Sequence, residues 1–499
     1  MTLLFTAESA EHAEQKRISY LRALRELGGK TVFAILAIGL GLLIARLPLS
    51  VSLAILVGGG LLALAVLEPL VGLGIMLLLA PAEPLLSAAG LLPFSIGQAT
   101  FALFAGAWLL RGLARRELRW PALPITIPFA LYLFAAALSL SVSHPASPKD
   151  GGTELLKWIE MYLVAGMVAA SGRGKLKWVI AAIFLAGVAQ AGIGLWQFQF
   201  RGHGPEAFKI LGEHYRAYGT LEQPNPFAGF MGIVWPIAAS VSVYFLLNST
   251  LLIALTSALI ALASLVALFI SFSRGAWLGA AAAGLAMLVF WPRRRWIGLA
   301  FASGGLVAMF ALYQFGLLPA SISSRFADVG DFLQVYDVRG VHVNDTNFAI
   351  VERLAHWQAA VNMANAHPVF GVGFGNYEAA YDDYRLIKWQ YALGHAHMIY
   401  LNVLAETGAL GLAAYLILWG AIFAITLRAT DLSGLNRALA IGLLGAWTHL
   451  ATHQLLDNLY VGNIPLLIGA LLGVLCILAT RETPNAGQNI RSTRSGSIR

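Results

Sequence analysis

Cysteine is almost absent from this chain, and charge is scarce. The one cysteine, Cys476, leaves no possibility of an intrachain disulfide or of a cysteine-based metal site. Charged residues make up 12% of the sequence and hydrophobic residues 58%, whereas soluble proteins carry about 25% charged residues. With a mean hydropathy of +0.73, this composition excludes an ordinary soluble protein.

Nucleotide-binding signatures are also missing. Neither a P-loop nor a Gly-x-Gly-x-x-Gly fingerprint occurs, so nothing indicates nucleotide-driven transport or a nucleotide cofactor. Any chemistry is therefore expected on a substrate that arrives already activated. The net charge of +8 could suggest nucleic acid, but in a membrane protein the placement of the charge matters more, and we expect no nucleic-acid partner.

Long apolar runs are what the chain does contain. Runs of about 17–23 residues recur from Thr31 to Thr480, and each is long enough to cross a bilayer. They predict an all-α polytopic membrane protein with about 12–14 transmembrane helices. Three prolines within residues 50–90 leave open whether that region forms two spans or one span and a re-entrant segment. The charged sequence before the first run does not resemble a cleaved signal peptide.

The polar segments give the expected division of the chain and its orientation. Basic clusters at 111–119, 173–177, 293–295 and 428–437 fall on one side, which we assign to the cytoplasm together with both termini. The predicted parts are a basic cytoplasmic tail, 1–30; transmembrane helices, 31–317, with an outer loop at about 199–225; a large folded extracytoplasmic loop, 318–397, with an amphipathic helix at Asn347–Ala366; the last three helices, 398–480; and a disordered cytoplasmic tail, 481–499.

Two histidines stand where the large loop meets the next apolar run. His395 and His397 lie at the expected membrane surface, and Glu406 follows nine residues after His397. A carboxylate that deep in an apolar helix is costly unless it has a partner or a water-filled cavity. Histidine is the side chain best suited to proton transfer near neutral pH. The alternative is that the histidines are interfacial and Glu406 is a structural hydrogen-bonding group.

Two arginines stand at the outer ends of helices. Arg216 precedes the run that starts near Pro226, and Arg274 lies in a short connection between two apolar runs. Such arginines often only extend to the membrane surface. Their functional interpretation is an anion clamp, because guanidinium groups bind phosphate with two parallel hydrogen bonds and a helix N-terminus adds further donors.

A third polar group is spaced along the penultimate helix. His449, His453 and Asp457 recur every four residues and predict one polar face at its outer end. Two histidines at this spacing can bind zinc, but no third ligand or general base accompanies them, so we favour a hydrogen-bonded stripe beside a polar cavity over a metal site. Lys157 and Glu160 are expected to form a buried ion pair.

Five segments in the same order resemble the O-antigen ligase and O-antigen polymerase superfamily of bacterial membrane glycosyltransferases. They cover the region from about Trp196 to Asn458, whereas the N-terminal half matches only as generic helices. The segments are RAYGTLEQPNPFAGF (216–230), SFSRGAWLG (271–279), ERLAHWQAAVNMANAHPVFGVGFGNY (352–377), HAHMIYLNVLAETGALG (395–411) and HQLLDN (453–458).

The resemblance implies a GT-C-like enzyme of the bacterial inner membrane with an extracytoplasmic active site. It would transfer a glycan from undecaprenyl diphosphate to an acceptor hydroxyl, with inversion and without metal or cofactor. Arg216 and Arg274 look like the diphosphate-binding arginines, His397 like the essential histidine, and Asp457 like the acidic residue of the penultimate helix, with Glu406 and His453 in support. Met398 replaces the Asn or Ser usual after that histidine, so His395 stays a second candidate for the catalytic base.

Two questions remain open at this point. The acceptor is a lipid A–core in a ligase and a second polyprenyl-linked glycan in a polymerase, and the sequence does not choose between them. A transporter or flippase of lipid-linked saccharides is the alternative from another class of protein. It would place its polar residues near helix centres and show repeat symmetry, whereas this chain gathers them at one membrane face.

Overall fold

The computed structural model describes residues 46–47, 49–88, 95–210, 212–317, 336–344 and 347–480. The chain divides into two units between Leu67 and Glu68. The described part of the first unit contributes α2, Leu49–Leu67. The predictions for the N-terminal tail, most of the first apolar run, the start of the large loop (318–335) and the C-terminal tail lie outside the described residues.

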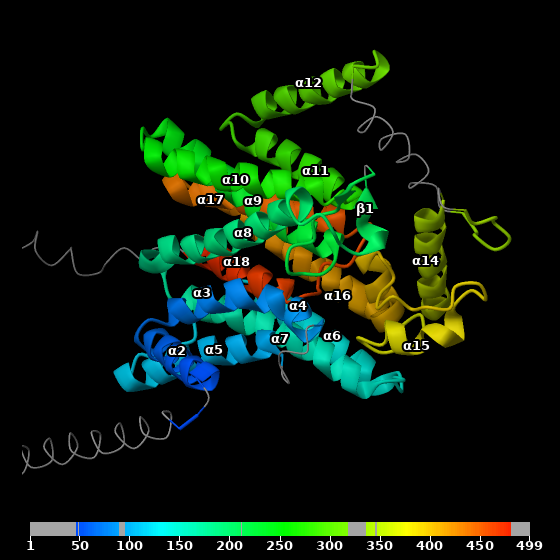
Figure 1. Cartoon of the computed structure of the whole chain (residues 1–499), viewed down its shortest axis with the longest axis horizontal. Helices are drawn as coiled ribbons and strands as arrows, with labels where there is room; N and C mark the ends of the chain where they lie inside the picture. The colour runs from blue at the N-terminus through cyan, green and yellow to red at the C-terminus, as the bar shows by residue number, and fades with distance from the viewer. Residues whose placement is uncertain are drawn as a thin grey trace, which may run out of the picture. The chain divides into compact units, whose positions relative to one another are not determined.

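The second unit is built almost entirely of helices (Figure 1). Its first half contains α3 (Pro69–Leu79), η1 (Ala80–Ala82), α4 (Glu83–Ala88), α5 (Ile96–Arg115), α6 (Thr126–Val142), α7 (Pro148–Ala170), η2 (Arg173–Lys175), α8 (Leu176–Gln199), η3 (Glu206–Phe208) and an antiparallel pair of two-residue strands, β1 (Lys209–Ile210) and β2 (His214–Tyr215). Its second half contains α9 (Pro224–Leu247), α10 (Leu251–Ile270), α11 (Arg274–Phe290), α12 (Arg295–Gln314), α14 (Phe348–Ala366), α15 (Tyr377–Tyr384), α16 (Ile399–Ala429), α17 (Gly434–His453) and α18 (Ile464–Ala479).

This arrangement confirms an all-α polytopic membrane protein. Within the described residues, seven helices are long and apolar enough to cross a membrane: 69–87, 96–115, 173–199, 224–247, 251–270, 295–314 and 399–429. Shorter apolar helices add 58–67, 126–142, 274–290 and 464–479. The helices of residues 50–90 separate into α2 and a continuous 69–87 span that tolerates the internal prolines as a turn of 3₁₀ helix.

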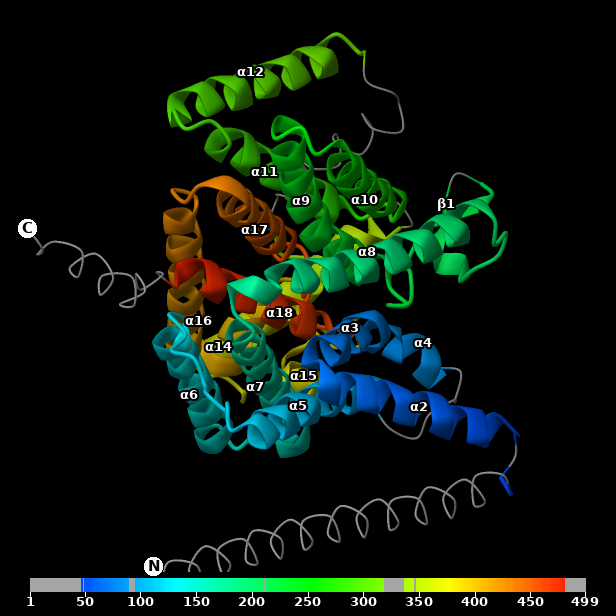
Figure 2. The ribbon, with the colours of Figure 1, turned by 90° about the vertical axis from the view of Figure 1, so that its left-hand side faces the viewer.

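The most buried helix is α18. Every residue from Ile464 to Leu478 is buried, and Figure 2 shows α18 enclosed by α7, α8, α16 and α17. Gly469 and Gly473 are one turn apart on the side that meets α7, and a Cβ on Gly469 would lie 2.5 Å from the carbonyl oxygen of Met161. Small residues at this spacing let two membrane helices approach closely. The packing fixes α7 against the C-terminal core.

The large loop folds as expected, with helices of its own. The predicted amphipathic helix is α14, and it buries one face, which includes Val351, Ala355 and Met363. It packs against α15 and α16. The large loop therefore packs against the membrane helix α16 and is not joined to the other helices by its ends alone.

One predicted ion pair is wrong. Lys157 does not pair with Glu160; its ammonium lies 2.7 Å from the carboxylate of Glu154, one turn earlier on α7. Both partners are half-buried at the edge of a cavity described below, whereas Glu160 is buried. Sequence spacing permits either pair, and the packing of α7 decides between them.

Candidate functional site

A glycine-rich run, Gly371–Gly375, is interlocked with a break in α16. Gly371, Gly373 and Gly375 all adopt left-handed backbone conformations. Val372 donates a backbone hydrogen bond of 2.9 Å to the Ala405 carbonyl, and Gly373 donates one of 3.0 Å to Glu406. A Cβ on Gly371 would lie 2.2 Å from the carbonyl carbon of Glu406, so only glycine fits there.

The break itself is at Gly408. Its φ of 63° and ψ of −166° interrupt the helical geometry of α16, and the carbonyl groups freed before it accept the hydrogen bonds of the glycine-rich run. The Glu406 carboxylate accepts a hydrogen bond of 3.2 Å from the Tyr377 amide. The buried Glu406 carboxylate therefore has the hydrogen-bond partner that its burial requires. The same hydrogen bond connects the large loop to α16.

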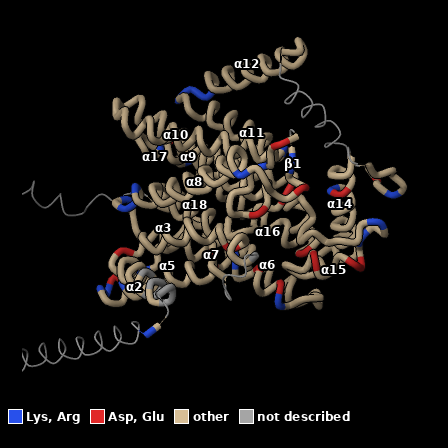
Figure 3. The backbone as a smooth tube through the Cα atoms, in the orientation of Figure 1, with Lys and Arg blue, Asp and Glu red and all other residues tan. Residues whose placement is uncertain are grey.

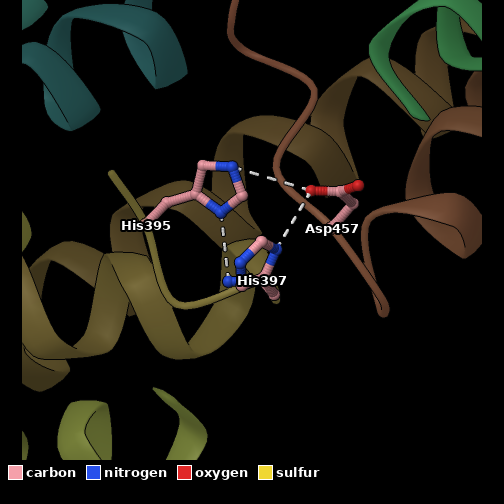
Figure 4. Close-up of side chains that lie close together, drawn as sticks. All are labelled: His395, His397 and Asp457. Carbon is pink, nitrogen blue, oxygen red and sulfur yellow. Dashed lines mark hydrogen bonds and ion pairs between the residues drawn. The ribbon is translucent and has the colours of Figure 1, made fainter. Parts of the chain in front are cut away.

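The two histidines converge on one carboxylate. His395 Nε2 and His397 Nδ1 each lie 3.7 Å from the same oxygen of Asp457, Oδ1 (Figure 4). The Asp457 side chain is 5% exposed, against 17% for His395 and 22% for His397. The histidines come from the segment before α16 and the aspartate from the segment after α17. These two segments are joined because the Ile399 amide donates to the Asp457 carbonyl at 3.2 Å.

The hydrogen bonds around the two rings distinguish their roles. His395 Nδ1 accepts a 3.1 Å hydrogen bond from the His397 amide, which places the His395 proton on Nε2, facing Asp457. Both nitrogens of His395 are thus engaged. His397 turns Nδ1 toward Asp457, and its Nε2 is buried without a hydrogen-bond partner among the described residues. An imidazole held at Nδ1 with a free Nε2 is the arrangement of a general base.

The backbone of the segment before α16, which carries the two histidines, has an uncommon conformation. His397 is left-handed with φ of 53°, as are Leu393 and Gly394. Asn402 stabilises the turn, because its side-chain oxygen accepts a 3.0 Å hydrogen bond from the Ala396 amide. Non-glycine residues with positive φ are uncommon and are enriched at functional sites, so the turn points to a function for His397.

Burial and charge set the ionisation of this cluster. Burial alone would raise the pKa of Asp457, but the facing imidazoles of His397, His395 and His453 hold it well below its ordinary value. Burial lowers the pKa of His395 to about 4, although Asp457 opposes the shift. At neutral pH the cluster therefore contains a carboxylate anion next to a neutral His395.

Arginines line a separate cavity beside this cluster. The cavity has a volume of about 150 Å³ and is lined by Arg216, Arg274 and Arg353 together with Asn225 and His453. None of the described residues that line it is acidic. The cavity lies at the N-termini of α9 and α11, whose dipoles add to the positive potential. Three guanidinium groups and two helix N-termini are therefore gathered at one cavity, an arrangement whose positive charge suits an anion.

The arginines reach this cavity from three parts of the chain. The Nε of Arg216 donates a 2.7 Å hydrogen bond to the Ser271 carbonyl at the end of α10, and its Nη2 donates one of 3.3 Å to Asn225 Oδ1. Arg274 is the first residue of α11, directly after the N-cap Ser273. Arg353 comes from α14 in the large loop. Arg216 and Arg274, the two arginines that the sequence indicated, therefore line the same cavity.

Arg353 was not singled out from the sequence. It lines the cavity together with Arg274, and burial lowers the pKa of its guanidinium while the charge of Asp457 raises it. His356 follows three residues later on the same helix, and its ring lies 5.4 Å from that of His397. The sequence contains a signal for both residues. Arg353 and His356 are three residues apart, as neighbours on one helix face are, and they lie in a segment that resembles the family.

The predicted stripe on α17 is wrong in part. The helix ends at His453, and Asp457 lies in the following segment, where the backbone hydrogen bonds of Ile399 to Gln454 and Asp457 replace helical ones. His449 is fully buried between α9 and α11, against Gly232 and Gly279. Only His453 lines the arginine cavity, with its Nε2 3.3 Å from Ser273 Oγ.

The candidate metal ligands lie elsewhere than the sequence suggested. Among the described residues, the ligand atoms of His395, His397 and Asp457 all lie within 4.8 Å of one another. His449 and His453 do not form such a group there. Two nitrogens and one carboxylate oxygen would suit zinc, so the alternative of a metal belongs to this cluster.

Acidification should destabilise the protein through His356. Its ring is buried, the Tyr377 hydroxyl lies 3.0 Å from its Nδ1, and burial, helped by the charges of His397 and His395, lowers its pKa to about 3. An unfolded histidine has a pKa of about 6.5, so between these values the unfolded state binds a proton that the folded state does not. Stability should therefore be complete above pH 6.5 and fall progressively toward pH 3.

Thermal unfolding of the purified protein in detergent between pH 7.5 and pH 4 tests this expectation. The His356→Asn variant should lose less of its Tm on acidification than the wild type. The matched control is His203→Asn, because His203 is exposed in the connection between α8 and η3, and it should follow the wild type. An equal fall of Tm in the His356→Asn variant would contradict the assignment.

Comparison with known protein families agrees with the resemblance seen in the sequence. Residues 259–416 match the family model described as O-antigen ligase. The match extends from α10 to α16 and includes Arg274, Arg353, His395, His397 and Glu406, whereas Arg216 and Asp457 lie outside it. No curated protein matches the chain. The resemblance to the O-antigen ligase and polymerase superfamily is thereby confirmed.

Proposed function

From the match to the O-antigen ligase family, which supports a membrane glycosyltransferase of the ligase or polymerase type, we propose a specific reaction. The chain transfers a glycan from undecaprenyl diphosphate to an acceptor hydroxyl at the outer face of the bacterial inner membrane. Both termini are cytoplasmic and the large loop is extracytoplasmic. The observation that carries this proposal is the three-arginine cavity beside a histidine–aspartate cluster.

The arginine cavity serves as the diphosphate site. As the bond between the sugar and the diphosphate breaks, negative charge develops on the leaving oxygen. Arg216, Arg274 and Arg353 are already in place to receive it, and preorganised cations stabilise such charge more than water does. Guanidinium groups also keep their charge on burial, so this role needs no metal ion.

His397 serves as the general base. The acceptor oxygen forms a bond to the anomeric carbon, the bond from that carbon to the diphosphate oxygen breaks, and the hydroxyl proton passes to His397 Nε2. The Asp457 anion on the other side of the ring then stabilises the imidazolium that forms. Because one nucleophile displaces the diphosphate directly, the anomeric configuration inverts. Glu406 and His453 position the loop and the cavity.

Chelation provides the test of this mechanism. Purified protein with an undecaprenyl-diphosphate oligosaccharide and candidate acceptors, either a lipid A–core or a second polyprenyl-linked glycan, should form a new glycosidic bond at the same rate with and without excess EDTA. Product is measured by mass spectrometry, which also shows which acceptor is used.

Two other outcomes would contradict the proposal. Activity that is lost on chelation and restored by zinc would make His395, His397 and Asp457 metal ligands instead of a base and its partners. Movement of the labelled donor across a vesicle bilayer without any new glycosidic bond would identify a flippase of lipid-linked saccharides.

A further inference from the structure

We propose that a second cavity, beside His395, binds the sugar of the acceptor and selects a neutral or amino-bearing sugar over a phosphorylated one. This proposal rests on the proposed function and names the substrate class of that same site. The cavity has a volume of about 290 Å³. That is at the lower end of the range for small-molecule sites, roughly 300–1,000 Å³, and suits a sugar unit rather than a whole glycan.

Acidic side chains outnumber basic ones in the lining of the cavity. Its lining contains four carboxyl groups, Asp150, Glu154, Glu378 and Glu406, and one lysine, Lys157. The lysine is held by Glu154 at 2.7 Å, so its charge is largely compensated. Figure 3 shows acidic residues gathered around α15 and the neighbouring segments. A phosphorylated sugar in this cavity would face uncompensated negative charge.

The carboxylates stand close to the histidines. A Cβ on Gly394, the residue before His395, would lie 3.9 Å from Glu378 Oε2. Asp150 and Glu378 are both exposed at the mouth of the cavity, and His395 forms part of its wall. A sugar bound between them would therefore have a hydroxyl within reach of the histidine–aspartate cluster.

Aromatic rings form the floor of the cavity. Trp158 and Tyr460 are buried with ring centroids 4.6 Å apart, and Tyr132 lies at the same distance from Trp158 on the other side. Aromatic faces offer apolar contact to a sugar ring and attract a nearby ammonium group. The side chain of Asn458 adds an amide nitrogen that can donate to a hydroxyl.

The two cavities have opposite charge, and Asp457 lies near both. The arginine cavity attracts the diphosphate of the donor, and the acidic cavity repels it. Charge therefore favours the donor in one cavity and the acceptor in the other. An acceptor that carried phosphate on the reacting sugar would compete for the arginines and be excluded from the acidic cavity.

A matched set of acceptors tests the proposal. They share one lipid or reducing-end tag and differ in the terminal sugar, which is a neutral hexose, the amino sugar or the 6-phosphate. We expect kcat/KM for the phosphorylated acceptor to be at least about tenfold lower than for the other two. Binding of the same three acceptors, measured without donor, should show the same order.

Charge-neutralising variants show whether the cavity is responsible. Glu378→Gln combined with Asp150→Asn should raise the ratio of phosphorylated to neutral acceptor use about tenfold and weaken binding of the amino sugar. The matched control is Asp383→Asn, an exposed carboxylate on the same helix as Glu378 that does not line the cavity, and its ratio should be that of the wild type.

The outcomes separate this proposal from the proposed function. Equal use and equal binding of all three acceptors, or an unchanged ratio in the double variant, would overturn the acceptor assignment while glycosyl transfer stands. Selective binding in the expected order without transfer to any acceptor would support the acidic cavity as a sugar site and overturn the transferase.

Discussion

Replacing His397 by asparagine should lower the rate of glycan transfer by about 10²–10⁴-fold, the usual contribution of a general base. Binding of the lipid-linked donor should remain within a few-fold of the wild type, because the arginine cavity is untouched. Asparagine is the preferred substitution here, since His397 has a φ of 53° and asparagine tolerates that conformation better than alanine. A loss of activity can then be assigned to the missing imidazole.

The matched variant is His395→Asn. Both nitrogens of His395 already have partners, one toward the His397 amide and one toward Asp457, so its removal loosens the turn but leaves the base in place. We expect a smaller loss of rate than for His397. Transfer and donor binding should be measured side by side, with the amount of folded protein as a control. An inactive His395→Asn beside a fully active His397→Asn would exchange the two roles.

Replacing Arg353 by glutamine should weaken donor binding, which the His397 variant leaves nearly unchanged. Removal of one guanidinium from the anion cavity should weaken binding of the undecaprenyl-diphosphate donor by roughly 10–100-fold, as expected for a hydrogen bond to a charged group. Arg353→Lys keeps a positive charge but loses the planar fork, so it should recover only part of this loss. Donor binding to the purified variants is the measurement.

The matched control for this effect is Arg339→Gln. Arg339 is also an arginine of the large loop, but it is exposed and pairs with Asp337. Its replacement should leave donor binding unchanged. If the Arg353 variants bind the donor as tightly as Arg339→Gln does, the diphosphate is held by Arg216 and Arg274 alone and α14 takes no part in donor binding.

The helices could be predicted from the sequence because bilayer thickness imposes their length. Each apolar run in the described residues forms a helix, and even the proline-containing span at 69–87 is continuous. The positions of Arg274 and His397 relative to those runs were sufficient to single them out. Local sequence fixed these features, so no knowledge of long-range packing was needed.

The partners of these residues could not be predicted, because they come from other parts of the chain. Asp457 was expected on α17, but backbone contacts with Ile399 end the helix before it, and the side chain turns to the histidines. Arg353 and Arg274 line one cavity although they lie on α14 and α11, two helices that are far apart in the sequence. Whether Lys157 pairs forward or backward along α7 likewise depends on what covers each face of the helix.

The interlock between the glycine-rich run and the break in α16 limits which segments of this chain can be exchanged with a related protein in a chimera. A Cβ on Gly408 would lie 2.3 Å from the Val369 carbonyl carbon, and one on Gly371 would meet the Glu406 carbonyl just as closely. Each glycine therefore leaves the space that the backbone of the other segment occupies. A chimera that exchanged only the large loop, and not α16, would therefore carry only one of the two interlocking segments. The glycine-rich run and the first part of α16, residues 371–408, would therefore have to be exchanged together to keep this interlock.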